Sequence, residues 1–269
     1  DASELHMLSH KKQHNLKTEA KAQVQYWNWD DSTKKRSPET IFGLYGCDKD
    51  KHFLDDFYKS KLYSTIAKDP NCLILEIWAG SNKTKLNGRR LSLATEEYYG
   101  NLSIKTQQFI QYCYRELNFS QIIKFDISCM RREFKGQAFE GRQPLNLEKL
   151  DSFIRTKLDN PLKGRSCQRL EDHYSGFRLV QNPTFKNIEC WARKKQSTIN
   201  LRKVFKSESE IPSFYTGKCY AISRELSKLI AQEGYAIAHQ HKKLLNGSED
   251  LMIARIARKM IEIKMQKIK

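Results

Sequence analysis

The sequence lacks the features that mark several common classes of protein. Its 269 residues contain no CxxC pair, and none of the seven cysteines has a histidine partner at zinc-ligand spacing. No stretch approaches the ~20 apolar residues of a membrane-spanning helix. Internal repeats and low-complexity segments of consequence are also absent. We therefore expect neither a zinc protein, nor a membrane span, nor a repeat architecture.

The cysteine count does not define a compartment. An odd number of cysteines leaves at least one thiol unpaired in a monomer, so disulfides are permitted but not required. Acceptor sequons for N-glycosylation at Asn82, Asn101, Asn118 and Asn246 are compatible with a secretory location. Because the chain starts at Asp1 rather than at methionine, we expect a soluble fragment with room for a preceding signal or anchor.

Positive charge dominates a composition that is otherwise typical of a folded protein. Hydrophobic residues make up 39% of the chain, which excludes a mainly disordered protein. The 48 lysines and arginines outnumber the 31 acidic residues, giving a net charge of +17. Such a surface attracts phosphates, anionic glycans, nucleic acid or acidic membranes. Nucleic acid is not the expected partner, since zinc-finger spacing, an RNP-like aromatic strand and a clear helix-turn-helix are missing.

Hydrophobic patterning predicts a polar lead-in over residues 1–40 and one α/β domain over 41–269. Three short apolar runs are typical of buried strands: "IFGLYG" (41–46), "CLILEIW" (72–78) and "QIIKFDI" (121–127). Strands that alternate with helices indicate a mostly parallel sheet flanked by helices. In such a sheet, ligands collect at the carboxyl ends of the strands.

Helical periodicity fills the spaces between these runs. A face of apolar residues spans 53–66, and a second amphipathic stretch spans 103–117, with Asn101 or Ser103 as its cap. Further helices are predicted over 146–158, from Ser223 to Gln232 with Gly234 as the stop, and from Glu249 to the C-terminus.

Asp126 is the first candidate for chemistry, because it stands at the carboxyl end of the third strand. One interpretation is a ligand-binding carboxylate at the edge of the sheet. The other is an ordinary turn or capping carboxylate. The residues around it favour the first interpretation.

Four short segments together resemble one enzyme family. "EYYGNLSIKT" (97–106) is similar to the block D-x-Y-x-N-L-T-x-K-T of the β-1,3-galactosyltransferase and β-1,3-N-acetylglucosaminyltransferase family. "KFD" (124–126) resembles the family's strand end K-x-D-x-D. "IPSFYTGKCYAIS" (211–223) resembles Y-P-x-Y-x-x-G-x-x-Y-V-x-S, and "SEDLMIARI" (248–256) is similar to E-D-V-x-x-G. The segments follow the order that the family has.

The resemblance implies a GT-A-type, Rossmann-like fold and an inverting glycosyltransferase. Such an enzyme moves a hexose or N-acetylhexosamine from a UDP-sugar to a hydroxyl of a glycan acceptor, here in β-1,3 linkage. Asp250 is then the candidate catalytic base, with Glu249 as an orienting or acceptor-binding neighbour. An alternative function for both carboxylates is to cap the last helix.

The same resemblance implies a donor site around Lys124, Asp126 and Ser128. The family holds Mn²⁺ or Mg²⁺ with the aspartates of D-x-D, so Asp126 is the candidate metal ligand. Here Ser128 replaces the last aspartate. Weak metal binding, metal-free stabilisation of the leaving group and a catalytically degenerate binding protein all remain open. Arg131 and Arg132 are the candidate cations for the metal-free case.

The remaining features concern acceptor binding and the location of the protein in the cell. Tyr215 can stack on a sugar while Gly217 admits the acceptor, although a plain loop explains both residues nearly as well. The basic C-terminal helix is compatible with peripheral membrane contact, and core packing is the commoner use of such a helix. The family implies the Golgi lumen, as the ectodomain of a membrane-anchored protein; the alternative is a bacterial or viral cytoplasm.

Overall fold

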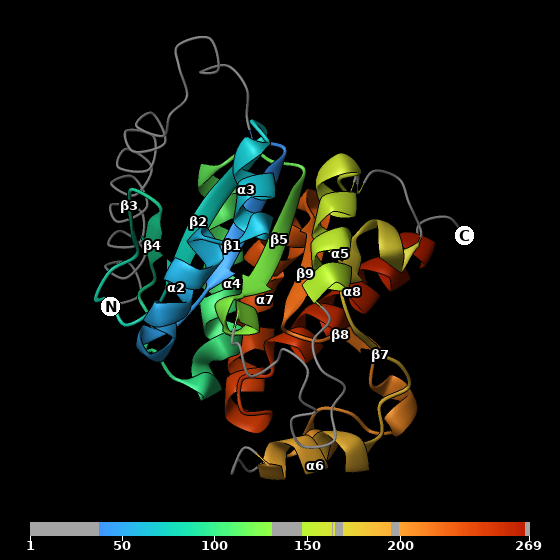
Figure 1. Cartoon of the computed structure of the whole chain (residues 1–269). Coiled ribbons are helices and arrows are strands. Elements are labelled where there is room, and N and C mark those ends of the chain that lie inside the picture. The colour runs from blue at the N-terminus through green and yellow to red at the C-terminus, as the bar shows by residue number, and fades with distance from the viewer. Residues whose placement is uncertain (1–37, 131–146, 163, 165–168, 195–198, 267–269) are drawn as a thin grey trace, which may run out of the picture.

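The computed structural model describes residues 38–130, 147–162, 164, 169–194 and 199–266. A seven-stranded sheet has the order β3-β4-β2-β1-β5-β9-β6, and β7 pairs with β8 in a separate ribbon (Figure 1). The strands are β1 (Thr40–Tyr45), β2 (Cys72–Trp78), β3 (Lys85–Asn87), β4 (Arg90–Ser92), β5 (Gln121–Asp126), β6 (Tyr174–Gly176), β7 (Leu179–Val180), β8 (Phe214–Tyr215) and β9 (Cys219–Ser223). The predicted lead-in lies almost entirely outside the described residues.

The centre of the sheet is parallel, as the sequence predicted. β1 lies between β2 and β5 and runs parallel to both, and β4 continues parallel beside β2. β9 runs antiparallel to β5, with Phe125 paired to Cys219. Residues just before β9 therefore lie at the edge where β5 ends. This reversal brings the segment around Gly217 beside Asp126.

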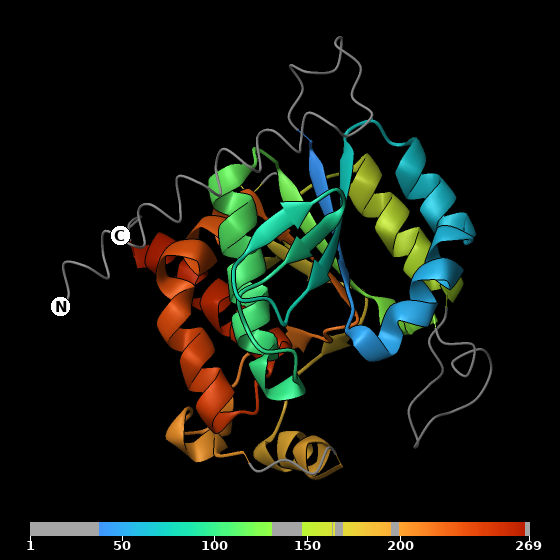
Figure 2. The ribbon, with the colours of Figure 1, turned by 90° about the vertical axis from the view of Figure 1, so that its left-hand side faces the viewer.

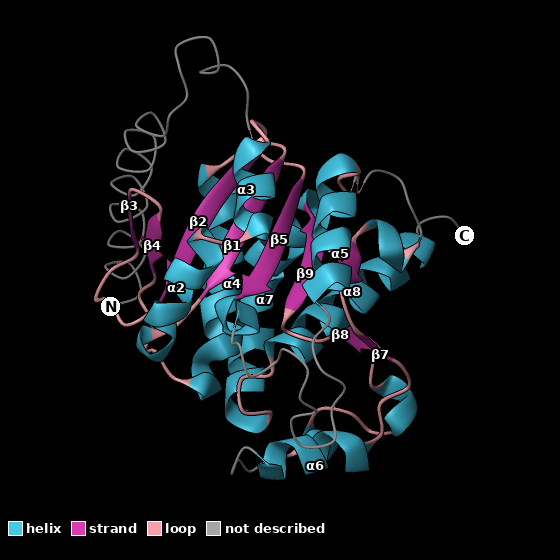
Figure 3. Ribbon diagram, in the orientation of Figure 1, coloured by secondary structure: helices cyan, strands magenta, loops and turns pink. Residues whose placement is uncertain are grey.

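Helices cover both faces of the sheet, which confirms the predicted α/β class with a mostly parallel sheet (Figures 2 and 3). The helices are α2 (Lys51–Tyr58), α3 (Lys61–Lys68), α4 (Leu102–Glu116), α5 (Leu147–Asp159), α6 (Phe185–Lys194), α7 (Arg224–Leu244) and α8 (Glu249–Gln266). α2, α3 and α5 lie on one face, and α4, α7 and α8 lie on the other.

The strands carry apolar side chains on both faces, as expected for strands between two helical layers. In β1, Ile41 and Tyr45 belong to the core that α4, α7 and α8 close. Phe42 and Leu44 belong to the second core, beneath α2, α3 and α5. Gly43 faces α4, where a Cβ atom would stand 2.7 Å from the ring of Phe109. The absence of a side chain lets α4 pack close to the sheet.

Two helix predictions were wrong in detail. The apolar face over 53–66 belongs to two helices, because Ser60 caps α3 by accepting a hydrogen bond from the Tyr63 N–H at 3.1 Å. α7 continues through Gly234 to Leu244 instead of stopping. A Cβ at Gly234 would lie 3.5 Å from Gln107 of α4, an ordinary van der Waals distance, so the helix continues through this glycine beside α4.

The predicted cap of α4 was also wrong. The Asn101 side chain donates instead to the Glu96 carbonyl at 3.1 Å, and no side-chain hydrogen bond caps the helix. Ser103 lies inside the helix, and its hydroxyl donates to the Ala238 carbonyl of α7 at 2.9 Å. Both side chains therefore tie α4 to its surroundings. Asn101 is only 2% exposed, so its sequon is inaccessible in the folded protein.

Two findings concern the expected membrane contact, and a third concerns the cysteines. Within the described ranges, no helix has the length and apolar character needed to cross a membrane. The apolar residues of α8, including Leu251, Ile256 and Met260, are buried in the core, as the core-packing alternative predicted. The six cysteines that the structure describes are free thiols.

Candidate functional site

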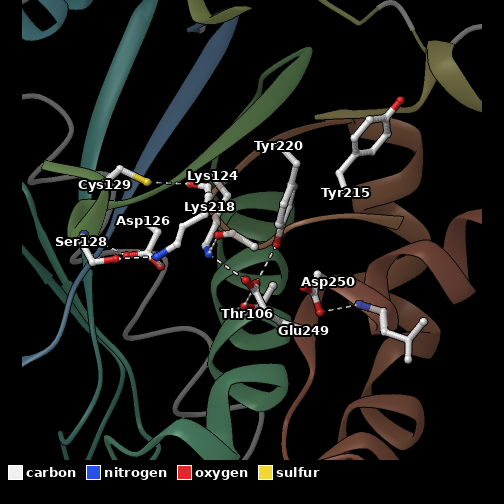
Figure 4. A network of polar contacts seen from close by, with 12 residues as sticks. Thr106, Lys124, Asp126, Ser128, Cys129, Tyr215, Lys218, Tyr220, Glu249 and Asp250 are labelled. Carbon is white, nitrogen blue, oxygen red and sulfur yellow. Dashed lines mark hydrogen bonds and ion pairs between the residues drawn. The ribbon is translucent and has the colours of Figure 1, made fainter. Parts of the chain in front are cut away.

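A buried carboxylate, Glu249, joins the four motif segments at the carboxyl edge of the sheet (Figure 4). Its Oε2 accepts hydrogen bonds from Thr106 of α4 and Tyr220 of β9, each at 2.9 Å. Its Oε1 pairs with the Lys124 ammonium of β5 at 2.7 Å. Glu249 and Lys124 are each only 2% exposed. One residue from every segment of the resemblance thus takes part in a single contact network.

The charges in this network compensate one another. Burial lowers the pKa of Lys124, but the negative charges of Glu249 and Asp126 outweigh it, so the pKa is raised and the ammonium stays charged. Burial and the Glu249 charge raise the pKa of Tyr220 well above its usual value, so its hydroxyl stays neutral and donates. The Lys124 ammonium also lies 4.7 Å from the centre of the Tyr45 ring, within cation–π range.

A second, partly buried ion pair ties the first motif segment to the end of β1. Lys105 contacts Glu97 at 2.8 Å and donates to the Gly46 carbonyl at 2.7 Å. The same Glu97 carboxylate accepts the Ala79 N–H, just after β2, at 2.8 Å. Burial is the larger influence on Lys105, and it lowers the pKa of the ammonium despite the neighbouring Glu97. This pair fixes the loop before α4 against two strand ends.

The predicted donor residues lie at the end of β5, together with a lysine that the sequence interpretation missed. Lys218 donates to the Ser128 hydroxyl at 2.8 Å and lies 3.5 Å from Oδ2 of Asp126. Oδ1 of Asp126 accepts the Ser128 N–H at 2.9 Å. Burial raises the pKa of Asp126, but the charges of Lys218 and Lys124 and the contacts with Ser128 outweigh it and hold the pKa at about 2. The available signal for Lys218 was its position directly after Gly217.

The donor set does not fit a divalent metal ion. Asp126 offers one carboxylate, Ser128 is a weak ligand, and the Lys218 ammonium already lies between them. A doubly charged ion about 4 Å from that ammonium would meet a repulsion of about 8 kcal/mol at an effective dielectric constant of about 20. Among the described residues, no group of three or more His, Cys, Asp or Glu side chains is placed to hold a metal.

Asp250 and Glu249 are adjacent in the sequence, but their environments differ. Asp250 is partly exposed in the first turn of α8, and its Oδ1 accepts the Leu251 N–H at 2.9 Å. The capping contact that the sequence left open for Asp250 is therefore present. In Figure 4, Asp126 and Asp250 lie on opposite sides of Glu249. Of these two carboxylates, that of Asp250 can be reached from solvent, whereas that of Glu249 is buried.

The remaining predicted residues lie apart from this network or outside the described chain. The Tyr215 ring points away from Glu249 in Figure 4 and packs edge-on against Tyr174, with ring centres 5.0 Å apart. Gly217 leaves room for the Glu249 carboxylate, which a Cβ at this position would strike. Arg131 and Arg132 lie outside the described residues.

No protein-family model and no curated protein sequence matches this chain. The resemblance therefore rests on its motif residues. The contacts around Glu249 join segments that are far apart in the sequence.

The turn before α8 is held by a buried histidine of α7. The Nδ1 atom of His241 in α7 lies 3.0 Å from the Ser248 carbonyl oxygen and 3.1 Å from its hydroxyl. Burial, reinforced by the Arg255 charge, lowers the pKa of His241 to about 3. Gly247 has φ +68°, and a Cβ here would strike the backbone of Gly100. His241 and this glycine turn position the start of α8.

Proposed function

We propose that the protein is an inverting glycosyltransferase of GT-A type. It transfers a hexose or N-acetylhexosamine from a UDP-sugar to a glycan hydroxyl, with β-1,3 linkage. The observation that carries the proposal is the contact of Glu249 with Thr106, Lys124 and Tyr220. A chance resemblance gives no reason for four distant segments to meet at the carboxyl edge of a parallel sheet, where ligands of such folds bind.

The proposed reaction assigns a role to each part of the site. The acceptor oxygen attacks the anomeric carbon, and the bond from that carbon to the β-phosphate oxygen breaks, so its electron pair leaves with UDP. Asp250 takes the proton of the acceptor hydroxyl as general base. Glu249 is buried and acts by positioning: it fixes the first turn of α8, and with it Asp250, against β5, α4 and β9.

The acceptor is proposed to approach from the side of Asp250. Tyr215 is a candidate for stacking on the acceptor sugar, because it is partly exposed and its backbone is fixed by the Tyr215 N–H, which donates to the Tyr174 hydroxyl at 3.1 Å. Gly217 contributes indirectly, because the absence of a side chain leaves space for the Glu249 carboxylate. The Golgi lumen remains the proposed location, with a bacterial or viral cytoplasm as the alternative; peripheral membrane contact through cations of α8 is a further proposal.

A second candidate function is glycan or partner binding without catalysis. The observation that favours it is Ser128, which replaces a carboxylate of the D-x-D pattern and accepts a hydrogen bond from Lys218. A protein that has lost transfer would keep the network around Glu249, since that network stabilises the fold. The two candidates differ in whether a donor is consumed.

The test is release of UDP from a panel of UDP-sugars, with and without a mixture of glycan acceptors. We expect one donor to be consumed and UDP release to rise when the matching acceptor is present. Asp250→Asn should lower that rate about 10²- to 10⁴-fold, the usual contribution of a general base. Glu262→Gln is the matched control, since Glu262 is an exposed carboxylate of the same helix, and it should leave the rate unchanged.

Two results would count against the transferase. UDP binding without consumption of any donor would favour the binding protein. Salt-sensitive retention on DNA, with no binding of UDP, would favour a nucleic-acid-binding protein.

A further inference from the structure

Lys218 contacts both Asp126 and Ser128 at the end of β5. Its Nζ donates to the Ser128 hydroxyl at 2.8 Å and lies 3.5 Å from Oδ2 of Asp126. Both residues of the D-x-S pair thus hold the same ammonium group. Figure 4 shows the lysine reaching from the segment before β9 toward these two side chains.

The backbone of Lys218 is fixed to the same strand end. The Asp126 N–H donates to the Lys218 carbonyl at 2.8 Å, within the antiparallel pairing of β5 and β9. The preceding carbonyl, that of Gly217, accepts a hydrogen bond from the buried Lys124 ammonium. A side chain with a fixed origin loses less freedom when it binds a ligand. The Lys218 side chain is nevertheless 37% exposed, so a ligand can reach it.

We propose that Lys218 is a built-in cation that binds the diphosphate of the nucleotide-sugar donor in place of a divalent metal ion. This inference rests on the proposed function and adds the means by which the leaving group is held. Asp126 and Ser128 orient the ammonium, as metal ligands would orient a metal ion. When the sugar leaves, the electron pair of the broken bond stays on the β-phosphate oxygen, and the ammonium stabilises that added negative charge.

To bind the diphosphate, the Lys218 ammonium must exchange its contact with Asp126 for a contact with a phosphate oxygen, and the geometry allows this. The 3.5 Å contact between Lys218 and Asp126 is longer than the 2.7–2.9 Å typical of charge-assisted hydrogen bonds. A phosphate oxygen can therefore approach the ammonium more closely than the Asp126 carboxylate does. Asp126 keeps its hydrogen bond from the Ser128 N–H and remains near the Lys124 charge.

The experiment is calorimetric titration of the protein with UDP and with uridine, in excess EDTA and in excess Mn²⁺. We expect the wild type to bind UDP equally well in both buffers. Lys218→Met should weaken UDP binding about 10- to 100-fold, the usual effect of losing a hydrogen bond to a charged group. Its uridine affinity should not change, because uridine has no diphosphate. Lys218→Arg keeps the cation and should retain most of the affinity.

A matched control separates this role from the overall positive charge. Lys228→Met removes one charge from an exposed position on α7 and should leave UDP binding unchanged. UDP binding by the wild type that disappears in EDTA and returns with Mn²⁺ would overturn the inference, even if Lys218→Met failed to fold. Equal UDP affinity of folded Lys218→Met and wild type would overturn it as well.

The failure of this inference is distinguishable from the failure of the proposed function. Metal-dependent UDP binding leaves the transferase proposal standing and removes Lys218 from its role. Absence of both UDP and uridine binding in either buffer removes the nucleotide site, and with it both proposals.

Discussion

The buried ion pair of Glu249 and Lys124 is expected to contribute strongly to the stability of the folded protein. In Glu249→Gln the side chain keeps its shape but loses its charge. Thr106, Tyr220 and Lys124 all donate to the two carboxylate oxygens. A glutamine has one oxygen and one NH₂ group, so when its oxygen faces Lys124 the two hydroxyls must turn to accept from the NH₂ group. The Lys124 ammonium also loses its nearest counter-charge while it stays 2% exposed.

The magnitude follows from the burial of both partners. Removing one member of a buried ion pair costs about 3–5 kcal/mol, because the remaining charge is left uncompensated. For a domain of roughly 150–250 residues, 1 kcal/mol shifts the melting temperature by about 2–4 °C. We therefore expect Glu249→Gln to melt about 6–20 °C below the wild type at pH 7.

The measurement is the free energy of unfolding in urea, followed by circular dichroism, for the variant and a matched control. Glu262→Gln breaks an exposed pair with Arg258, whose side chain is 46% exposed, and should change stability by less than about 1 kcal/mol. A double-mutant cycle with Lys124→Met isolates the pair. The double variant should lose at least about 1 kcal/mol less than the sum of the single losses.

Two outcomes would refute this reasoning. A loss below about 1 kcal/mol in Glu249→Gln would mean that water or local rearrangement compensates the Lys124 charge. Strict additivity in the cycle would mean that the two side chains do not depend on each other. In either case Glu249 would not be the group that holds α8 against the sheet.

Two further predictions concern the turn before α8 and the loop before β9. The pKa of His241 is lowered to about 3 in the folded protein, so only the unfolded chain takes up its proton as the pH falls below about 6.5. The wild type should therefore lose about 2 kcal/mol of unfolding free energy between pH 7 and pH 5, and a loss of the same size in His241→Asn would contradict this. Gly217→Ala places a Cβ against the Glu249 carboxylate and should cost about 1–3 kcal/mol. Gly234→Ala, in the middle of α7, should stay within about 1 kcal/mol of the wild type, and equal losses in the two variants would refute the steric argument.

The sequence predicted the regular elements where local pattern and packing agree. β2 and β5 follow from runs of Ile, Leu and Phe, and α4 follows from apolar residues at helical spacing. The prediction was wrong at Gly234, because a single glycine lowers helix propensity without ending a helix whose apolar face is packed in the core. It also missed the β3–β4 hairpin, whose strands are three residues each and carry too few side chains for an alternating pattern.

The candidate site was predicted only in part. Asp126, Lys124 and the pair Glu249 and Asp250 were named from their position in recognisable segments. The segments did not reveal that Glu249 is buried while Asp250 is partly exposed, because burial depends on what packs over the start of α8. Lys218 carried no local signal beyond its neighbour Gly217, and it reaches Ser128 only because β9 runs antiparallel to β5.

The sequence by itself determined the alternation of strands and helices, the strong positive charge and the four segments that carry the resemblance. These properties are local, since they depend on the period of apolar residues and on composition. The tertiary structure alone decided which of the segments meet. The partners of Glu249 lie 143, 125 and 29 residues away along the chain. Contacts over such separations arise when strands and helices bury their apolar faces together, and the polar groups left at the edge of the sheet must then find partners among themselves.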